Sequence, residues 1–83
     1  MTTRLSDMAP ARDPDLLADL GFRIQFLRQE IGLTQVELAT RVGTSTWSIS
    51  RWERGHVGPH ISFIVALANA LGCTTDWLVG RTA

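Results

Sequence analysis

The chain has 83 residues, enough for one small domain with a single modest core and without a second catalytic lobe. Its hydrophobic fraction of 45% is typical of a globular protein. Cys73 is the only cysteine, which excludes an internal disulfide and a multi-cysteine zinc site and fits a reducing compartment. No apolar run approaches the length of a membrane span, and residues 1–11 lack the hydrophobic block of a signal peptide. These features predict a soluble, cytoplasmic protein.

Charge is unevenly distributed although the formal net charge is zero. Residues 1–19 carry two arginines against four acids, a net charge of −2, and residues 20–83 carry six arginines against four acids, a net charge of +2. Residues 1–13 also show no hydrophobic period. The sequence therefore predicts a flexible N-terminal arm over residues 1–13 and one weakly cationic domain over residues 14–83.

The first helix is predicted to begin at Asp13-Pro14, an N-cap followed by proline at the first helical position. Gly32 is expected to end it. Gly21 costs a helix about 1 kcal/mol relative to alanine, so a later start near Asp19 is the alternative. Apolar residues at helical spacing predict the core-facing stripe: Leu16, Leu20, Ile24, Leu27 and Ile31.

Two short helices follow, with a tight turn between them. Thr34 and Glu37 have the spacing of a capping box, which predicts a helix from about residue 34 to Gly43. Its apolar contacts are predicted to be Val36, Leu38, Ala39 and Val42. Ser45 is the expected N-cap of the next helix, to about residue 54, with Ile49 and Trp52 buried. A turn this short fixes two helices at a steep angle, so the second can enter a DNA major groove.

Two further helices complete a predicted all-α, five-helix domain. One begins near Pro59 and ends at Gly72, and the other is capped by Thr74 and ends at Gly80. Trp52 and Trp77 are expected to fill core volume, and Cys73 is expected to be a small buried apolar residue. The core candidates of the fourth helix are Ile61, Ile64, Val65, Leu67, Ala68 and Leu71.

The punctuating residues of these helices resemble those of the lambda repressor, Cro and XRE family of helix-turn-helix regulators. The likeness covers about residues 20–80 and is carried by Gly32-Leu33-Thr34-Gln35, Glu37-Leu38-Ala39, Val42-Gly43, residues 49–55 (Ile-Ser-Arg-Trp-Glu-Arg-Gly), Ala70-Leu71-Gly72 and Asp76-Trp77-Leu78. The resemblance implies a compact lambda-repressor-like fold that binds double-stranded operator DNA and regulates transcription. A Cro-like or prophage-type repressor that binds a pseudo-palindromic operator as a homodimer is the expectation.

The same resemblance supplies a candidate site. Thr46, Trp47, Ser50 and Arg51 align with the positions that face base edges, and Arg28 is implied to pair with Glu53. Trp47 and Arg51 are one helical turn apart, so they share a face opposite Ile49 and Trp52. The arginine fork can bond O6 and N7 of guanine. Phosphate contacts are predicted for Gln35, Arg41, Arg54, His56 and His60.

Phe22 and Phe26 lie one turn apart on the predicted first helix, opposite its core stripe, and form an exposed apolar patch. The arm could cover them through Leu5 and Met8, or they could form a dimer or heteromeric interface. The last helix, at Trp77 and Val79, is the other interface candidate. A protein-binding role as an antitoxin or adaptor is the alternative function. An enzyme is not expected, since His56 and His60 lack a third metal ligand nearby and no cofactor motif is present.

Overall fold

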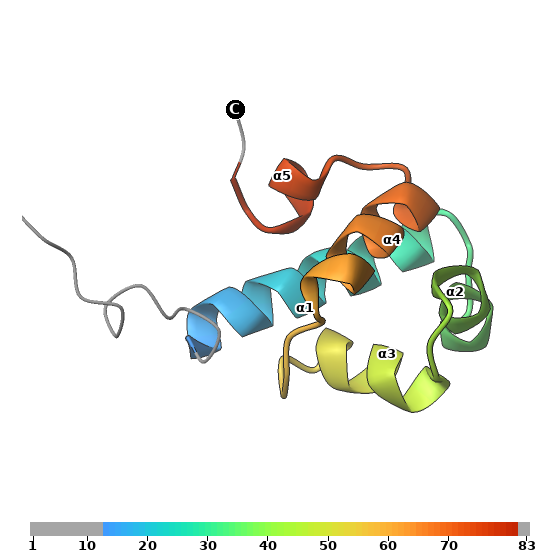
Figure 1. Ribbon diagram of the computed structural model, residues 1–83, viewed down its shortest axis with the longest axis horizontal. Coiled ribbons are helices and arrows are strands. Elements are labelled where there is room, and N and C mark those ends of the chain that lie inside the picture. The colour runs from blue at the N-terminus through green and yellow to red at the C-terminus, as the bar shows by residue number, and fades with distance from the viewer. Residues whose placement is uncertain (1–12, 82–83) are drawn as a thin grey trace, which may run out of the picture.

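The computed structural model describes residues 13–81, which form five helices and no strand. This confirms the predicted all-α fold. In chain order the helices are α1 Pro14–Glu30, α2 Gln35–Val42, α3 Thr46–Glu53, α4 Ile61–Leu71 and α5 Thr75–Leu78 (Figure 1). None of the helices between residues 13 and 81 is both long and apolar enough to cross a bilayer. Apart from Asp13, the predicted arm lies outside the described residues, as do Leu5 and Met8.

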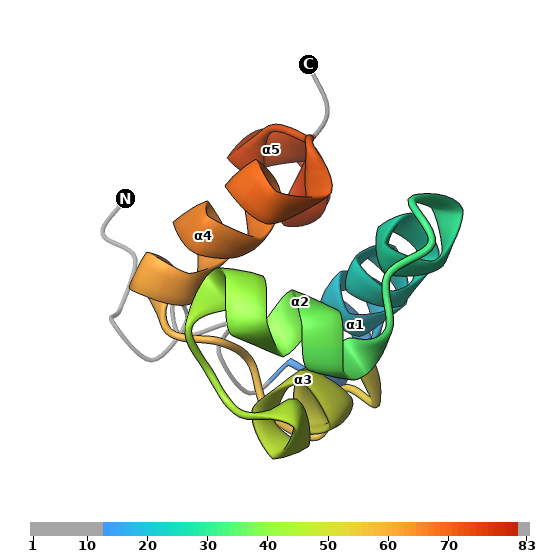
Figure 2. The same cartoon turned by 90° about the vertical axis from the view of Figure 1, so that its right-hand side faces the viewer.

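The long helix α1 is the support on which α3, α4 and α5 pack. The remaining helix, α2, packs against α3 and α4. Figure 2, which looks onto α2, shows α3 directly beneath it. In Figure 1, α2 lies at the right-hand end of the molecule and α3 lies beneath α1, while α5 lies on the opposite side of α1 from α3.

One completely buried side chain from each helix meets in the centre of the domain. These residues are Ile24, Leu38, Ile49, Leu67 and Leu78. Because every helix contributes one of them, no helix can leave without exposing core surface to water, and burial of apolar surface is the dominant stabilising term in a fold of this size.

Helix α1 begins where the Asp13-Pro14 pair predicts. The Asp13 carboxylate accepts a hydrogen bond of 2.9 Å from the N–H of Asp15, and Pro14 occupies the first helical position. The alternative start near Asp19 is wrong, because Gly21 does not interrupt the helix. It is instead the point at which α1 crosses α3: a Cβ there would overlap the carbonyl oxygen of Trp52 and lie 2.6 Å from that of Glu53. Glycine lets the two helix backbones touch.

Four predicted core residues are exposed, and each falls outside the stripe that its helix buries: Ile31, Val36, Ile61 and Val65. Ile31 is the C-cap of α1 and lies beyond its last helical residue. Val36 and Ile61 lie in the first turns of α2 and α4. Val65 follows the buried Ile64, and consecutive helical positions point about 100° apart.

Two further core predictions need correction. Cys73 and Trp77 are only half-buried, although both pack against the core. For Cys73 the position explains this, because it follows Gly72, the C-cap of α4, and lies in the linker to α5. The remaining burial still raises the pKa of the Cys73 thiol through desolvation. Trp77 leaves one side of its ring facing α1, where an arginine lies over it.

Candidate nucleic-acid interface

Helix α2 starts with the predicted capping box. The Thr34 hydroxyl accepts a 3.0 Å hydrogen bond from the N–H of Glu37, and the Glu37 carboxylate accepts one of 2.9 Å from the N–H of Thr34. These bonds favour the charged carboxylate, and with Arg41 nearby they lower the pKa of Glu37. The first turn of α2 is thereby fixed by its own sequence.

The turn after α2 is three residues long, from Gly43 to Ser45. Gly43 has a φ of 85°, and its N–H and that of Thr44 both donate to the carbonyl of Ala39, at 2.9 and 3.0 Å. The Ser45 hydroxyl then accepts a hydrogen bond of 3.1 Å from the N–H of Ser48, which starts α3. A left-handed residue, which glycine supplies without strain, is what allows so short a connection.

The inner side of α3 is packed against the rest of the domain. Ile49 is fully buried and Trp52 is nearly so. The Trp52 ring lies 5.3 Å from the ring of Phe63 on α4, measured between centroids. These anchors determine which side of α3 faces outward.

A buried ion pair fixes the C-terminal end of α3. Arg28 donates to both carboxylate oxygens of Glu53, from Nε at 2.6 Å and from Nη2 at 3.0 Å. Its third hydrogen bond, 2.9 Å long, goes to the carbonyl of Leu33, just before α2. Gln35 donates from Nε2 to the same Glu53 carboxylate at 3.0 Å. Glu53, whose side chain is 3% exposed, therefore ties α3 to α1 and to the start of α2.

The outer side of α3 carries the four predicted base-contacting residues. Thr46 and Trp47 are exposed, and Ser50 and Arg51 are partly exposed. Trp47 is 67% exposed, an unusual state for the largest side chain. The Arg51 guanidinium lies over its ring, 4.5 Å from the centroid. Helix α3 runs along the lower edge of the molecule in Figure 1, with this side directed away from the core.

The predicted phosphate-contacting residues are spread over α2 and the segment after α3. Arg41, Arg54 and His56 are exposed. His60 is exposed too, but its ring Nδ1 caps α4 by accepting a hydrogen bond of 3.3 Å from the N–H of Ser62. Gln35 is half-buried, with its amide on Glu53. Within residues 13–81, no three or more His, Cys, Asp or Glu side chains are grouped as metal ligands.

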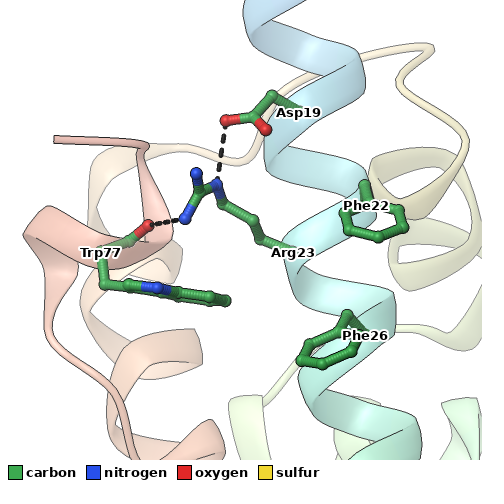
Figure 3. Close-up of a pocket in the computed structure, with 5 residues that line it drawn as sticks. All are labelled: Asp19, Phe22, Arg23, Phe26 and Trp77. Carbon is green, nitrogen blue, oxygen red and sulfur yellow. Dashed lines mark hydrogen bonds and ion pairs between the residues drawn. The ribbon is translucent and has the colours of Figure 1, made fainter. Parts of the chain in front are cut away.

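The predicted apolar patch lies on α1. Phe22 and Phe26 are 64% and 44% exposed, and their stacked rings lie 6.1 Å apart. With Asp19, Arg23 and Trp77 they line an open groove of about 320 Å³ between α1 and α5 (Figure 3). Val79, the other predicted interface residue of α5, is half-buried against the core.

Arg23 is the residue that the sequence reasoning missed. Its Nε donates to Asp19 at 2.9 Å, its Nη1 donates to the carbonyl of Trp77 at 2.9 Å, and its guanidinium lies 4.7 Å from the Trp77 ring centroid (Figure 3). It therefore fastens α5 to α1. An acid four residues before an arginine on a helix was the available signal for half of this arrangement.

Comparison with known proteins agrees with this geometry. A profile described as helix-turn-helix matches residues 24–78. Repressor protein C2 of Salmonella phage P22 is 37% identical over 60 residues, covering 72% of this chain and 28% of its own length. The transcriptional regulator ImmR of Bacillus subtilis is 32% identical over 62 residues, covering 75% of this chain and 49% of its own length. The chain thus spans half or less of these two relatives.

Solved structures show the same arrangement of helices. The P22 c2 repressor in complex with a synthetic operator superposes with a TM-score of 0.73 at 35% identity, covering 76% of this chain and 96% of that one. The restriction-modification controller protein C.AhdI from Aeromonas hydrophila gives a TM-score of 0.71 at 32% identity, covering 75% and 94%. With the match over most of its helices, the chain belongs to the helix-turn-helix family, in the branch of lambda-repressor-like and XRE regulators that its motifs resemble.

Proposed function

We propose that this protein binds double-stranded DNA by sequence and regulates transcription as a repressor, with α3 in the major groove. The observation that carries the proposal is the two-sided character of α3. Its inner side is anchored by Ile49, Trp52 and the Glu53 ion pair, while Thr46, Trp47, Ser50 and Arg51 project outward together. A rigid helix with an outward row of side chains is what major-groove reading requires. The P22 c2 relative, solved on a synthetic operator, supports the assignment.

The exposed arginines give this surface its affinity for a polyanion. Arg41 and Arg54 are exposed at the ends of α2 and α3, where contacts with phosphate would set the orientation of the protein. We propose His56, the Gln35 amide and His60 as weaker contributors. The acids Asp13, Asp15 and Asp19 gather at the start of α1 instead. The proposal involves no catalytic step, and such a protein would act in the compartment that holds the DNA, which we propose is the cytoplasm.

Selection from a randomised duplex pool tests the function directly. The wild-type chain should enrich a defined sequence, and fluorescence anisotropy should then show much tighter binding to that duplex than to a scrambled one. Arg54→Ala should weaken binding to both duplexes by a similar factor, because a phosphate contact carries no sequence information. Enrichment of no sequence, with equal binding to every duplex, would contradict the proposal.

We further propose that the operator is pseudo-palindromic and is bound by two copies of the chain. One recognition helix reads only a few base pairs, and two-fold dimers of this class read half-sites about 34 Å apart. Sedimentation equilibrium of the 9.2 kDa chain with and without the selected duplex tests this. The complex should contain two chains per duplex, and a single chain on a single half-site would rule the dimer out.

The exposure of Phe22 and Phe26 favours a second candidate function, in which the groove between α1 and α5 binds a protein. A second copy of this chain is the occupant that the dimer requires, and another protein, as in an antitoxin or adaptor, is the alternative. Phe22→Ser with Phe26→Ser should abolish self-association if the groove holds the second copy. An unchanged dimer would place the interface elsewhere, for instance on α5 at Trp77 and Val79.

A further inference from the structure

The outer side of α3 contains an arginine that is held by its flat face and not by its edge. The Arg51 guanidinium lies 4.5 Å above the Trp47 ring. Among residues 13–81, the arginine side chains that donate hydrogen bonds are Arg23 and Arg28. The N–H groups of Arg51 therefore have no acceptor within the described part of the protein.

Stacking and hydrogen bonding use different parts of a guanidinium group. The cation–π contact is made by the face of the planar group, whereas its five N–H donors lie in the plane and point out from its edge. A stacked arginine can therefore still bond O6 and N7 of guanine with its fork. The rotamer freedom that a free arginine would lose on binding is already reduced.

The same chain contains a stack with the opposite arrangement of donors. The Arg23 guanidinium lies 4.7 Å from the Trp77 ring, but its edge is used by Asp19 and by the carbonyl of Trp77. That pair joins two helices. The pair on α3 joins nothing, since both of its members belong to one helix and Trp47 is 67% exposed. An exposed indole that holds an arginine with free donors has a use only if a ligand comes to that edge.

We propose that Trp47 is a positioning residue: it holds the Arg51 fork ready for one guanine of the operator half-site, and it so determines specificity for that base. This inference rests on the proposed function. It assigns to Trp47 an effect on the discrimination between bases at the position that Arg51 reads. An effect on overall affinity alone would instead indicate a direct contact of the indole with the DNA.

The stack is tested first in the free protein. In wild type the Arg51 Nε–H proton should be shifted upfield by the Trp47 ring current in a ¹H–¹⁵N spectrum, and Trp47→Leu should return it to the ordinary arginine position. Thermal unfolding should be the same for both chains, because the indole is largely exposed. An Arg51 signal that Trp47→Leu leaves in place overturns the stack whatever the protein does with DNA.

The second test is a double-mutant cycle on duplexes that differ in one base pair. The probes are the duplex selected by the wild type and the same duplex with guanine replaced by adenine at the Arg51 position. Wild type should prefer guanine by roughly 10- to 100-fold, and Arg51→Ala, which removes the donors, should lose that preference. Trp47→Leu should lower the preference by about 2- to 5-fold, with Trp47→Phe in between. In the Arg51→Ala background, Trp47→Leu should change the preference no further.

Three results distinguish failure of the positioning role of Trp47 from failure of the proposed function. A Trp47→Leu chain that binds both duplexes more weakly by the same factor keeps the proposed function and overturns the positioning role. Equal losses in the wild-type and Arg51→Ala backgrounds overturn it as well. A wild-type chain that selects no sequence overturns the proposed function and this inference with it. Val65→Ala, which trims an exposed apolar side chain on α4, is the control and should alter neither affinity nor preference.

Discussion

The two sides of α3 use similar residue types for different purposes. Facing inward, Trp52 packs on Phe63 and Glu53 has all its hydrogen bonds made by Arg28 and Gln35. Facing outward, the Arg51 guanidinium stacks on Trp47 and donates no hydrogen bond within residues 13–81. A tryptophan and a charged group thus contribute to stability on the inner side, and on the outer side they belong to the surface that we propose binds DNA. Donors with acceptors in the fold are typical of structural residues such as Arg28, and we propose that the stacked but unbonded donors of Arg51 mark a binding residue.

The largest effect is expected from removing Arg28, the residue of α1 that pairs with Glu53 of α3. Arg28→Ala leaves the Glu53 carboxylate buried without a cation, and breaking such a pair costs about 3–5 kcal/mol. We expect the free energy of urea unfolding to fall by that amount. The double variant Arg28→Ala with Glu53→Gln should recover part of the loss, because the neutral amide is cheaper to bury. Equal stability of Arg28→Ala and wild type would show that the pair is not a structural anchor.

The contact between α1 and α3 gives the next largest effect. Gly21→Ala would improve helix propensity by about 1 kcal/mol if the position were open. Here the new Cβ meets the carbonyls of Trp52 and Glu53, so we expect a net loss of about 2 kcal/mol from overpacking. Ala18→Gly, in the preceding turn, is a control that should cost only propensity. Stabilisation by Gly21→Ala in a thermal melt would contradict the close crossing.

Gly21 also shows where sequence reasoning reached its limit. Caps and turns are local, so Asp13, Thr34, Gly43 and Ser45 were predicted with their roles. From the sequence, Gly21 could be assessed only by its cost in helix propensity. The need for glycine comes from α3, about 30 residues further along the chain, whose backbone leaves no room for a side chain. The spacing of residues along the sequence does not predict which helices pack together or how closely their backbones approach.

The four exposed residues that were predicted to belong to the core were misjudged for the same reason. Helical period places Val65 near the core stripe of α4, but only the neighbouring helices decide how wide that stripe is. The outward direction of Trp47 and Arg51 was predictable because Ile49 and Trp52 fix the rotation of α3. The stack of Arg51 on Trp47 and that of Arg23 on Trp77 could be found only from the side-chain positions in the structure.

On the outer side, loss of Arg51 should affect binding alone. Arg51→Ala should change stability by less than about 0.5 kcal/mol, because the donors that it removes make no bond within the described residues. It should reduce affinity for the selected operator by roughly 1–3 kcal/mol, measured by anisotropy. A large drop in melting temperature would show that Arg51 contributes to the stability of the fold.

Arg23 provides a contrast to Arg51, because its guanidinium also stacks on a tryptophan but donates hydrogen bonds to Asp19 and to the carbonyl of Trp77. Arg23→Ala should destabilise the protein by about 1 kcal/mol, since the ion pair is partly exposed and the cation–π contact is modest. With the dimer interface outside the groove, operator affinity should be unchanged at temperatures where the fold is intact. Phe22→Ala, one residue away and exposed, is the control for stability. An effect of Arg23→Ala on affinity without one on stability would reverse the assignment of the two stacks.

The smallest expected effect belongs to the capping box of Thr34 and Glu37 at the start of α2. The fold lowers the pKa of Glu37 below the value of 4.5 that it has without these contacts. Its contribution to stability is therefore complete above that value and is lost as the pH falls through the lower, folded pKa. Glu37→Gln should melt slightly below wild type at pH 7, and the gap should narrow toward pH 3 as the Glu37 carboxylate becomes protonated. A gap of equal size at both pH values would mean that the charge of Glu37 does not stabilise the start of α2, and that the Thr34 hydroxyl alone holds it.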